Sequence, residues 1–294
     1  MESYHSIVIG RGKPLIFLPA AGFSGMEGLN IAEALSDEYE SHLLDLPGMG
    51  KSNGISGNVS KTKIASWVKN YVDQHNLKKV TFVGHSMGAG VAMCFATVYP
   101  DDVAEIILLD QGHFKIPRFQ TAEFGLLGYA VPILSIAERI LGDMFAKKVS
   151  GLFSSKESAE PSEADNEKRL GEFCERFQLP KSEYITKALK EDIDFTHEGL
   201  RLMFGYYRLD LPKMLKQLTV PCLLIYASFH DIDPKRERFI EKSVQKIAPS
   251  PNLQIKKIDS HHYVHWADDK CISEVKSFVD SHDEVTTSII RRIT

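Results

Sequence analysis

The sequence has few cysteines, no long apolar run and no large excess of either charge. Its cysteines stand far apart and form no CxxC pair, so neither a disulfide framework nor a cysteine zinc site is expected; the four are Cys94, Cys174, Cys222 and Cys271. No stretch approaches the about 18 uninterrupted apolar residues of a membrane-spanning helix. The formal net charge is −4 and no long basic cluster stands out, so nucleic acid is not an expected partner.

The first residues, Met1 to His5, also lack the basic and apolar segments of a secretory signal peptide. A length of 294 residues suits one large domain or one domain with a sizeable insertion. Together these features predict a cytoplasmic protein whose partner is a small molecule. They do not indicate an oligomeric state.

The segment Val83 to Gly88 is typical of a strand, a sharp turn and a helix, with Ser86 at the turn. A residue on such a turn has strained backbone angles, so only small neighbours fit two positions to either side, and Gly84 and Gly88 stand there. The turn would expose the Ser86 hydroxyl, and the N–H of Met87 would point to where an oxyanion develops. Ser86 is therefore a candidate nucleophile. The simpler alternative is an ordinary glycine-rich turn.

Apolar runs of strand length alternate with segments of helix length in the first and last parts of the chain. Such alternation predicts an α/β fold with a mostly parallel sheet covered by helices on both faces. Gly10-Arg-Gly12, between the first two strands, predicts a tight hairpin. The expected strands are His5–Ile9, Pro14–Leu18, His42–Pro47, Val80–Val83, Glu105–Asp110, Cys222–Tyr226 and Leu253–Ile258, and the expected helices are Gly25–Leu35, Val59–His75, the segment behind Ser86 up to Pro100, and Asp269–His282.

The alternation stops near Gly112 and resumes at Val220, which predicts a helical insertion. The expected organisation is a core domain of residues 1–112 and 213–294 with a helical cap of residues 113–212. The polar run Lys156 to Arg169 is expected to be a mobile solvated loop. Apolar side chains in the first part of the cap either pack on one another or line a substrate pocket; the candidates for the pocket wall are Phe124, Leu127, Tyr129 and Leu134.

A serine hydroxyl is a weak nucleophile at neutral pH and needs a base that a third group orients. Histidines are concentrated in Asp259–Trp266, after the last expected strand, and Asp231 follows the strand Cys222–Tyr226. Ser86, Asp231 and one of these histidines would then lie at the C-terminal ends of separate parallel strands, where open α/β sheets bind ligands.

These motifs resemble those of the α/β-hydrolase superfamily, in particular its capped esterase-like and lactonase-like members, over almost the full length of the chain. Gly84–Gly88 matches the nucleophile elbow residue by residue, and Asp45–Ser52 is similar to the loop after the family's fourth strand. His261–Trp266 resembles the terminal histidine motif of the family. The resemblance implies a mostly parallel sheet of seven or eight strands and a triad, in the family order, of Ser86, Asp231 and His262.

The chain departs from the family pattern after its second strand, where Pro19-Ala-Ala21 replaces the usual His-Gly. A backbone donor needs no particular side chain, so the Ala21 N–H would be the second oxyanion donor beside that of Met87. The resemblance implies no cofactor.

The acid is the least defined member of the implied triad. The turn that holds Asp231 is about one residue longer than the family's turn, which leaves Asp233 as a lesser candidate. Asp110 occupies the alternative position that some members use. His261 and His265 could share a helix face as metal ligands, but the glutamate of the zinc-peptidase helix motif is absent, so no metal is expected.

The full set of motifs favours a serine hydrolase that cleaves an ester, thioester or lactone of a small, partly apolar substrate through an acyl-enzyme. Two other functions occur on scaffolds that keep the same triad. One is carbon–carbon bond hydrolysis or an elimination without a cofactor. The other is ligand reception, in which the cap closes over a small molecule and presents a surface to another protein.

Overall fold

A computed structural model describes residues 3–117, 128–153, 162–191, 193 and 196–293 of the chain. Its centre is a sheet of seven strands in the order β1-β3-β2-β4-β5-β6-β7, in which only β1 is antiparallel to its neighbour. This agrees with the expected α/β fold and with the smaller of the two expected strand counts. The strands are β1 (Ser6–Gly10), β2 (Lys13–Leu18), β3 (Tyr39–Leu44), β4 (Val80–His85), β5 (Val103–Leu109), β6 (Cys222–Ala227) and β7 (Leu253–Ile258).

The expected hairpin of β1 and β2 is wrong, because β3 lies between these two strands. The connection at Gly10–Lys13 passes over the turn that enters β3, where the Arg11 and Lys13 N–H groups donate to the carbonyls of Ser36 and Glu38. Gly12 has a φ of +117°, and a Cβ there would lie 2.1 Å from the Glu38 carbonyl oxygen. The glycine therefore permits a close crossing of two backbones rather than a two-strand turn.

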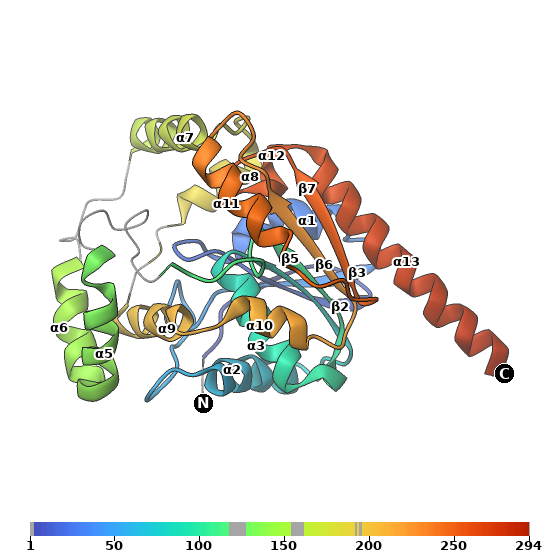
Figure 1. Cartoon of the computed structure of the whole chain (residues 1–294), viewed down its shortest axis with the longest axis horizontal. Coiled ribbons are helices and arrows are strands. Elements are labelled where there is room, and N and C mark those ends of the chain that lie inside the picture. The colour runs from blue at the N-terminus through green and yellow to red at the C-terminus, as the bar shows by residue number, and fades with distance from the viewer. Residues whose placement is uncertain (1–2, 118–127, 154–161, 192, 194–195, 294) are drawn as a thin grey trace.

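Helices cover both faces of the sheet, and alternate residues of β2 face opposite sides. Ile16 and Leu18 pack with α2 and α3 on one face, whereas Leu15 and Phe17 pack with α1 and α13 on the other. Figure 1 shows α2, α3 and α10 on one side of the sheet and α12 and α13 on the other. The first group is α2 (Lys61–Gln74), α3 (Met87–Val98), α9 (His197–Tyr207) and α10 (Leu211–Gln217); the second is α1 (Leu29–Ala34), α11 (Pro234–Val244), α12 (Val264–Ala267) and α13 (Asp269–Ile293).

The remaining helices, all between β5 and β6, form two groups that stand apart in Figure 1. The pair α5 (Val131–Leu141) and α6 (Asp143–Phe153) contacts α9. The pair α7 (Glu163–Phe177) and α8 (Glu183–Lys190) contacts the short 3-10 helix η1 (Gly25–Gly28). A second 3-10 turn, η2 (Pro100–Asp102), leads into β5.

The polar run expected as a loop is helical over its described second half. The Ser162 hydroxyl accepts a hydrogen bond from the Asp165 N–H, and the Asp165 carboxylate accepts one from the Ser162 N–H. This reciprocal capping box satisfies two N–H groups that would otherwise lack partners at the start of α7. Residues 156–161 lie outside the described residues.

The C-terminal helix α13 continues to Ile293, beyond the expected end at His282. The four cysteines are free and buried. Among the described residues, no helix is both long and apolar enough to cross a membrane.

Candidate active site

Ser86 lies on the turn between β4 and α3, with φ 51° and ψ −114°. Its N–H donates to the Leu109 carbonyl at the end of β5, 3.1 Å away. A Cβ on Gly84 would lie 2.6 Å from the Ala89 backbone, and one on Gly88 would lie 2.0 Å from the Leu18 carbonyl oxygen. These close approaches explain why both neighbours are glycines, and they leave the strained conformation to Ser86 itself.

Two N–H groups beside this turn are available to a ligand. The Gly88 N–H donates to the Pro19 carbonyl, 3.0 Å away, which holds the first turn of α3 against the loop that follows β2. Within the part of the chain that the structure describes, the N–H groups of Ala21 and Met87 have no hydrogen-bond acceptor. Met87 is also the first residue of α3, so its N–H lies at the helix end where the helix dipole favours negative charge. This arrangement suits the binding of an oxyanion.

His262, on the loop after β7, is held by a buried aspartate. Its Nδ1 lies 2.6 Å from Asp110 Oδ2, and the Asp110 carboxylate is fully buried. The other oxygen of Asp110 accepts the Ala227 N–H at 2.9 Å. Burial by itself raises the pKa of Asp110, but the hydrogen bond and positive charge of His262, together with the Ala227 N–H, hold the pKa below its usual value. Asp110 is therefore an ionised acceptor that orients the His262 ring.

The second ring nitrogen of His262 and the Ser86 hydroxyl have no hydrogen-bond partner among the described residues. Both groups are partly exposed. Nucleophile and base often close their hydrogen bond only when substrate is bound, so both atoms remain available for that step.

The expected pairing of His262 with Asp231 is wrong. The Asp231 side chain is 90% exposed and lies 3.4 Å from His230 rather than beside His262. Asp233, the lesser candidate, accepts the N–H groups of the first turn of α11. Both residues follow β6, whereas β5 is the strand next to Ser86 in the sheet and ends beside Asp110. From the sequence, Asp110 was predicted only as the alternative to Asp231 for the triad acid.

Among the described residues, one buried group near the Ser86 turn could hold a metal ion: Glu27, His85 and His265, whose ligand atoms lie within 4.8 Å of one another. Glu27 Oε1 lies 2.6 Å from His85 Nδ1, and Glu27 Oε2 accepts the Ala20 N–H at 2.6 Å. The other nitrogen of His85 lies 3.0 Å from the His262 carbonyl oxygen. Because Glu27 and His85 use these atoms in hydrogen bonds, the cluster is better described as a polar network than as a metal centre.

Aromatic residues of α7 pack on the loops that carry the candidate residues. The Phe173 ring lies 6.0 Å from Phe23 and 5.0 Å from Tyr263, and the Phe177 ring lies 4.8 Å from both His261 and Tyr263. Sequence reasoning missed these residues because the segment before them was interpreted as a loop. The signal was present, since Ser162 and Asp165 have the capping-box spacing and Phe173 and Phe177 are four residues apart on the helix that follows.

The four residues expected to form the pocket wall are not brought together around Ser86 by any described contact. Phe124 and Leu127 lie outside the described residues. Tyr129 is 59% exposed. Leu134 is half-buried on α5, which Figure 1 shows with α9 between it and the sheet.

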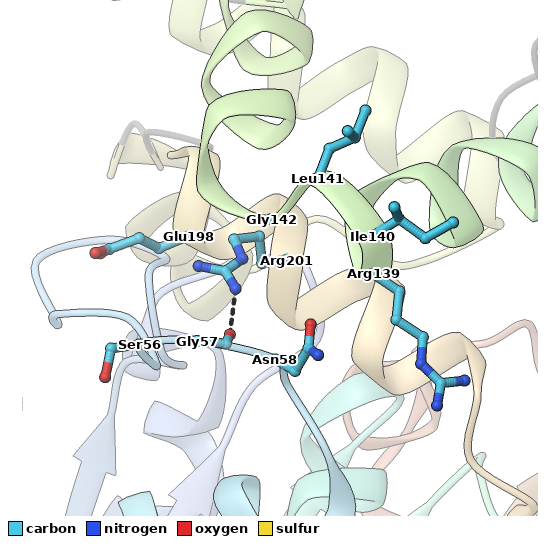
Figure 2. Close-up of a pocket in the computed structure, with 9 residues that line it drawn as sticks. All are labelled: Ser56, Gly57, Asn58, Arg139, Ile140, Leu141, Gly142, Glu198 and Arg201. Atoms are coloured by element: carbon cyan, nitrogen blue, oxygen red, sulfur yellow. Dashed lines mark hydrogen bonds between the residues drawn. The ribbon is translucent and has the colours of Figure 1, made fainter.

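A pocket of about 570 Å³ lies where the end of α5, Gly142 and α9 meet the loop before α2. Figure 2 shows Arg201 in it, pointing to the Gly57 carbonyl, to which it donates a hydrogen bond. Arg201 also pairs with the fully buried Glu138 at 3.1 Å, so its charge is already compensated. None of the candidate catalytic residues lines this pocket. The pocket lies between the helices that follow β5 and the loop before α2, and it is not the candidate active site.

A family model described as the alpha/beta hydrolase fold matches residues 13–133. Among curated proteins, a pimeloyl-[acyl-carrier protein] methyl ester esterase of Photobacterium profundum is 24% identical over 270 residues, which cover 92% of this chain and 96% of that protein.

Solved structures share the same fold. A thermophilic esterase from Thermogutta terrifontis, with malate bound, superposes with a TM-score of 0.66 at 20% identity and covers 96% of this chain and 94% of its own. The enol-lactonase from Burkholderia xenovorans does so with a TM-score of 0.62 at 16% identity, covering 95% and 97%. The matched family model and the seven-stranded sheet show that the chain has the α/β-hydrolase fold, and the related esterases support a hydrolase.

Proposed function

We propose that the protein hydrolyses a carboxylic ester, thioester or lactone of a small, partly apolar substrate with Ser86 as nucleophile, His262 as base and Asp110 as the orienting acid. The observation that carries this proposal is the 2.6 Å contact of His262 with buried Asp110 at the sheet end where Ser86 occupies a strained turn. Asp110 takes the role that the sequence assigned first to Asp231.

In the first half of the reaction, His262 Nε2 accepts the Ser86 proton as the Ser86 oxygen attacks the substrate carbonyl carbon. The N–H groups of Ala21 and Met87 stabilise the resulting oxyanion. The C–O or C–S bond to the leaving group breaks, and His262 returns its proton to the leaving group. A water molecule, deprotonated by His262, then attacks the acyl-enzyme and releases the acid and free Ser86.

The relatives support an ester rather than another class of substrate. The Photobacterium protein is a methyl ester esterase of a pimeloyl group, and the two structural neighbours are an esterase and an enol-lactonase. Hydrolysis of an ester or a lactone begins with attack of a nucleophile on an acyl carbonyl carbon. We therefore assign acyl transfer to water ahead of carbon–carbon cleavage, elimination or ligand reception.

Residues 113–212 act as the cap in this proposal. Support comes from one buried apolar cluster that joins α7 and α8 to the loops on either side of the site: Ala20, Phe23, Cys174, Leu179, Ile185, Ala188, Tyr263 and Trp266. A cap seated on both loops would restrict access to Ser86 and exclude water.

Labelling with a fluorophosphonate, followed by peptide mass mapping, tests the nucleophile. The expected adduct is on Ser86, it is absent from Ser86→Ala, and a panel of p-nitrophenyl esters from short to medium chain is hydrolysed only by the wild type. Labelling of Ser86 without turnover of any ester would favour carbon–carbon cleavage or elimination. A folded wild type that is not labelled would overturn the assignment of Ser86.

A further inference from the structure

Glu27 and His85 form a fully buried pair directly behind the candidate site. Glu27 belongs to η1, and His85 is the last residue of β4, next to Ser86. Neither side chain is exposed to solvent, and the 2.6 Å between Glu27 Oε1 and His85 Nδ1 is typical of a charge-assisted hydrogen bond. Neither residue takes part in the reaction steps proposed for Ser86 and His262.

The pair connects the three segments that must meet for catalysis. The second oxygen of Glu27 accepts the N–H of Ala20, whose next neighbour Ala21 supplies a proposed oxyanion donor. The second nitrogen of His85 donates to the His262 carbonyl at 3.0 Å. One chain of hydrogen bonds therefore runs from the loop after β2, through the nucleophile strand, to the loop of the catalytic histidine.

The bond pattern defines where the protons lie. A carbonyl oxygen can only accept, so His85 Nε2 carries a proton, and the bond to Glu27 needs another proton between Nδ1 and the carboxylate. Burial lowers the pKa of His85, but the charge of Glu27 and the hydrogen bonds to Glu27 and His262 outweigh burial and raise the pKa above its usual value. His85 is thus a double donor held between two acceptors.

We propose that Glu27 and His85 are positioning residues. They hold the Ala20–Ala21 loop, the Ser86 turn and the His262 loop in the relative positions that the reaction needs. This inference rests on the proposed function, because the geometry that it concerns is that of Ser86, His262 and the oxyanion donors. Misplacement of a reacting group by about 1 Å can cost about a hundredfold in rate, so loss of this connection should appear in kcat.

His265 does not turn the pair into a metal site in the described structure. Its ring is fully buried, its ring nitrogens have no hydrogen-bond partner within the part of the chain that the structure describes, and Nε2 lies 3.9 Å from Glu27 Oε1. A metal ion would have to displace the hydrogen bond between Glu27 and His85. Metal analysis of the purified wild-type protein should therefore find less than a stoichiometric amount.

The first test is His85→Phe, which keeps a planar ring and removes both donors. We expect kcat on the best p-nitrophenyl ester to fall about tenfold to a hundredfold, KM to change less than about threefold, and phosphonylation of Ser86 to slow in parallel. The matched control is Val72→Ala in α2, a buried residue outside this network, compared at a temperature where both variants are folded. Val72→Ala should retain the wild-type kcat.

The second test separates hydrogen bonding from packing at Glu27. Glu27→Gln can still accept from the Ala20 N–H and donate to His85 Nδ1, so it should keep kcat within about fivefold of wild type. Glu27→Met has a similar size and no polar atoms, so its kcat should fall as in His85→Phe. This pair keeps the proposal testable where His85→Phe does not fold.

Wild-type kcat in both His85→Phe and Glu27→Met would overturn the positioning role. Equal loss of kcat in Glu27→Gln and Glu27→Met would overturn it too, because the hydrogen bonds would then not be the cause. A stoichiometric metal in the wild type would replace it with a metal site. Failure of the proposed function is distinguishable from all of these, because the wild type itself would then give neither turnover nor a Ser86 adduct.

Discussion

At the scale of single residues, the first question is which of two aspartates orients His262. Asp110 and Asp231 follow the neighbouring strands β5 and β6. Replacing Asp110 by Asn should leave the structure intact but hold His262 in the wrong tautomer, lowering kcat by about 10³- to 10⁴-fold. Asp231→Asn is the matched control, since that side chain is exposed, and should stay within about twofold of wild type. Steady-state kinetics on one p-nitrophenyl ester decides the matter, and the reverse ranking would restore Asp231 as the acid.

His113 makes a residue-scale prediction about pH. It is buried, and neither ring nitrogen has a hydrogen-bond partner among the described residues. Burial lowers its pKa from 6.5 to about 4. The charge of Asp110 acts against this shift, and the positive charges of Arg236 and His262 add to it. Between these two values the unfolded chain binds a proton that the folded chain does not, so lowering the pH favours unfolding.

Urea unfolding of wild type and His113→Phe at pH 8 and pH 5 measures this linkage. The wild type should lose about 2 kcal/mol more stability than the variant between the two pH values, a figure that follows from the two pKa values. An identical loss in both proteins would mean that His113 is protonated in the folded state or that its site opens without cost.

At the scale of elements, α7 is the helix whose role changed most between sequence and structure. Its Phe177 ring packs beside His261 and Tyr263, which flank His262. Phe177→Ala should therefore change the ester chain length that gives the highest kcat/KM, whereas Glu175→Ala on the exposed side of the same helix should not. If both variants keep the wild-type preference, α7 does not shape the pocket.

The helix α5 behaves differently from the expectation that the first part of the cap hides its apolar side chains. Ile133, Ile136 and Ile140 are exposed within the described residues. Its inner side combines apolar and polar contacts. Val131 and Leu134 pack with the core cluster, and Arg208 donates to Ser135 and pairs with Glu138. Hydrophobic pattern alone could not show which side of this helix would find a partner.

At the scale of the whole molecule, the reactivity of the four free cysteines can show which buried clusters open most easily. Cys94, Cys222 and Cys271 lie in the two clusters against the sheet, whereas Cys174 belongs to the smaller cluster under α7 and α8. Burial raises the pKa of all four thiols, so each reacts only after local or global opening.

Labelling with a thiol reagent under native conditions, followed by mass mapping, should modify Cys174 first and the other three together on global unfolding. The reason is that a small cluster buries less apolar area and opens at a lower free energy than the central core. Modification of Cys94 or Cys222 ahead of Cys174 would show that α7 is as firmly attached as the sheet.

The sequence by itself determined the order of the seven strands along the chain, the α/β-hydrolase fold, and the strained turn at Ser86. These depend on local rules: period, turn sterics, and the absence of a side chain at Gly84 and Gly88. The conformation of Ser86 is settled within a few residues, so no distant contact is needed to predict it.

Only the tertiary structure decided which aspartate meets His262, which strand lies between β1 and β2, and that Glu27 lies behind the nucleophile. Asp110 and Asp231 both follow buried strands, and the resemblance to the family put Asp231 first. The choice depends on the spatial order of the strands and on the path of the loop after β7, which brings His262 to the end of β5. The contact of His262 with Asp110 joins residues 152 positions apart, and no local pattern encodes it.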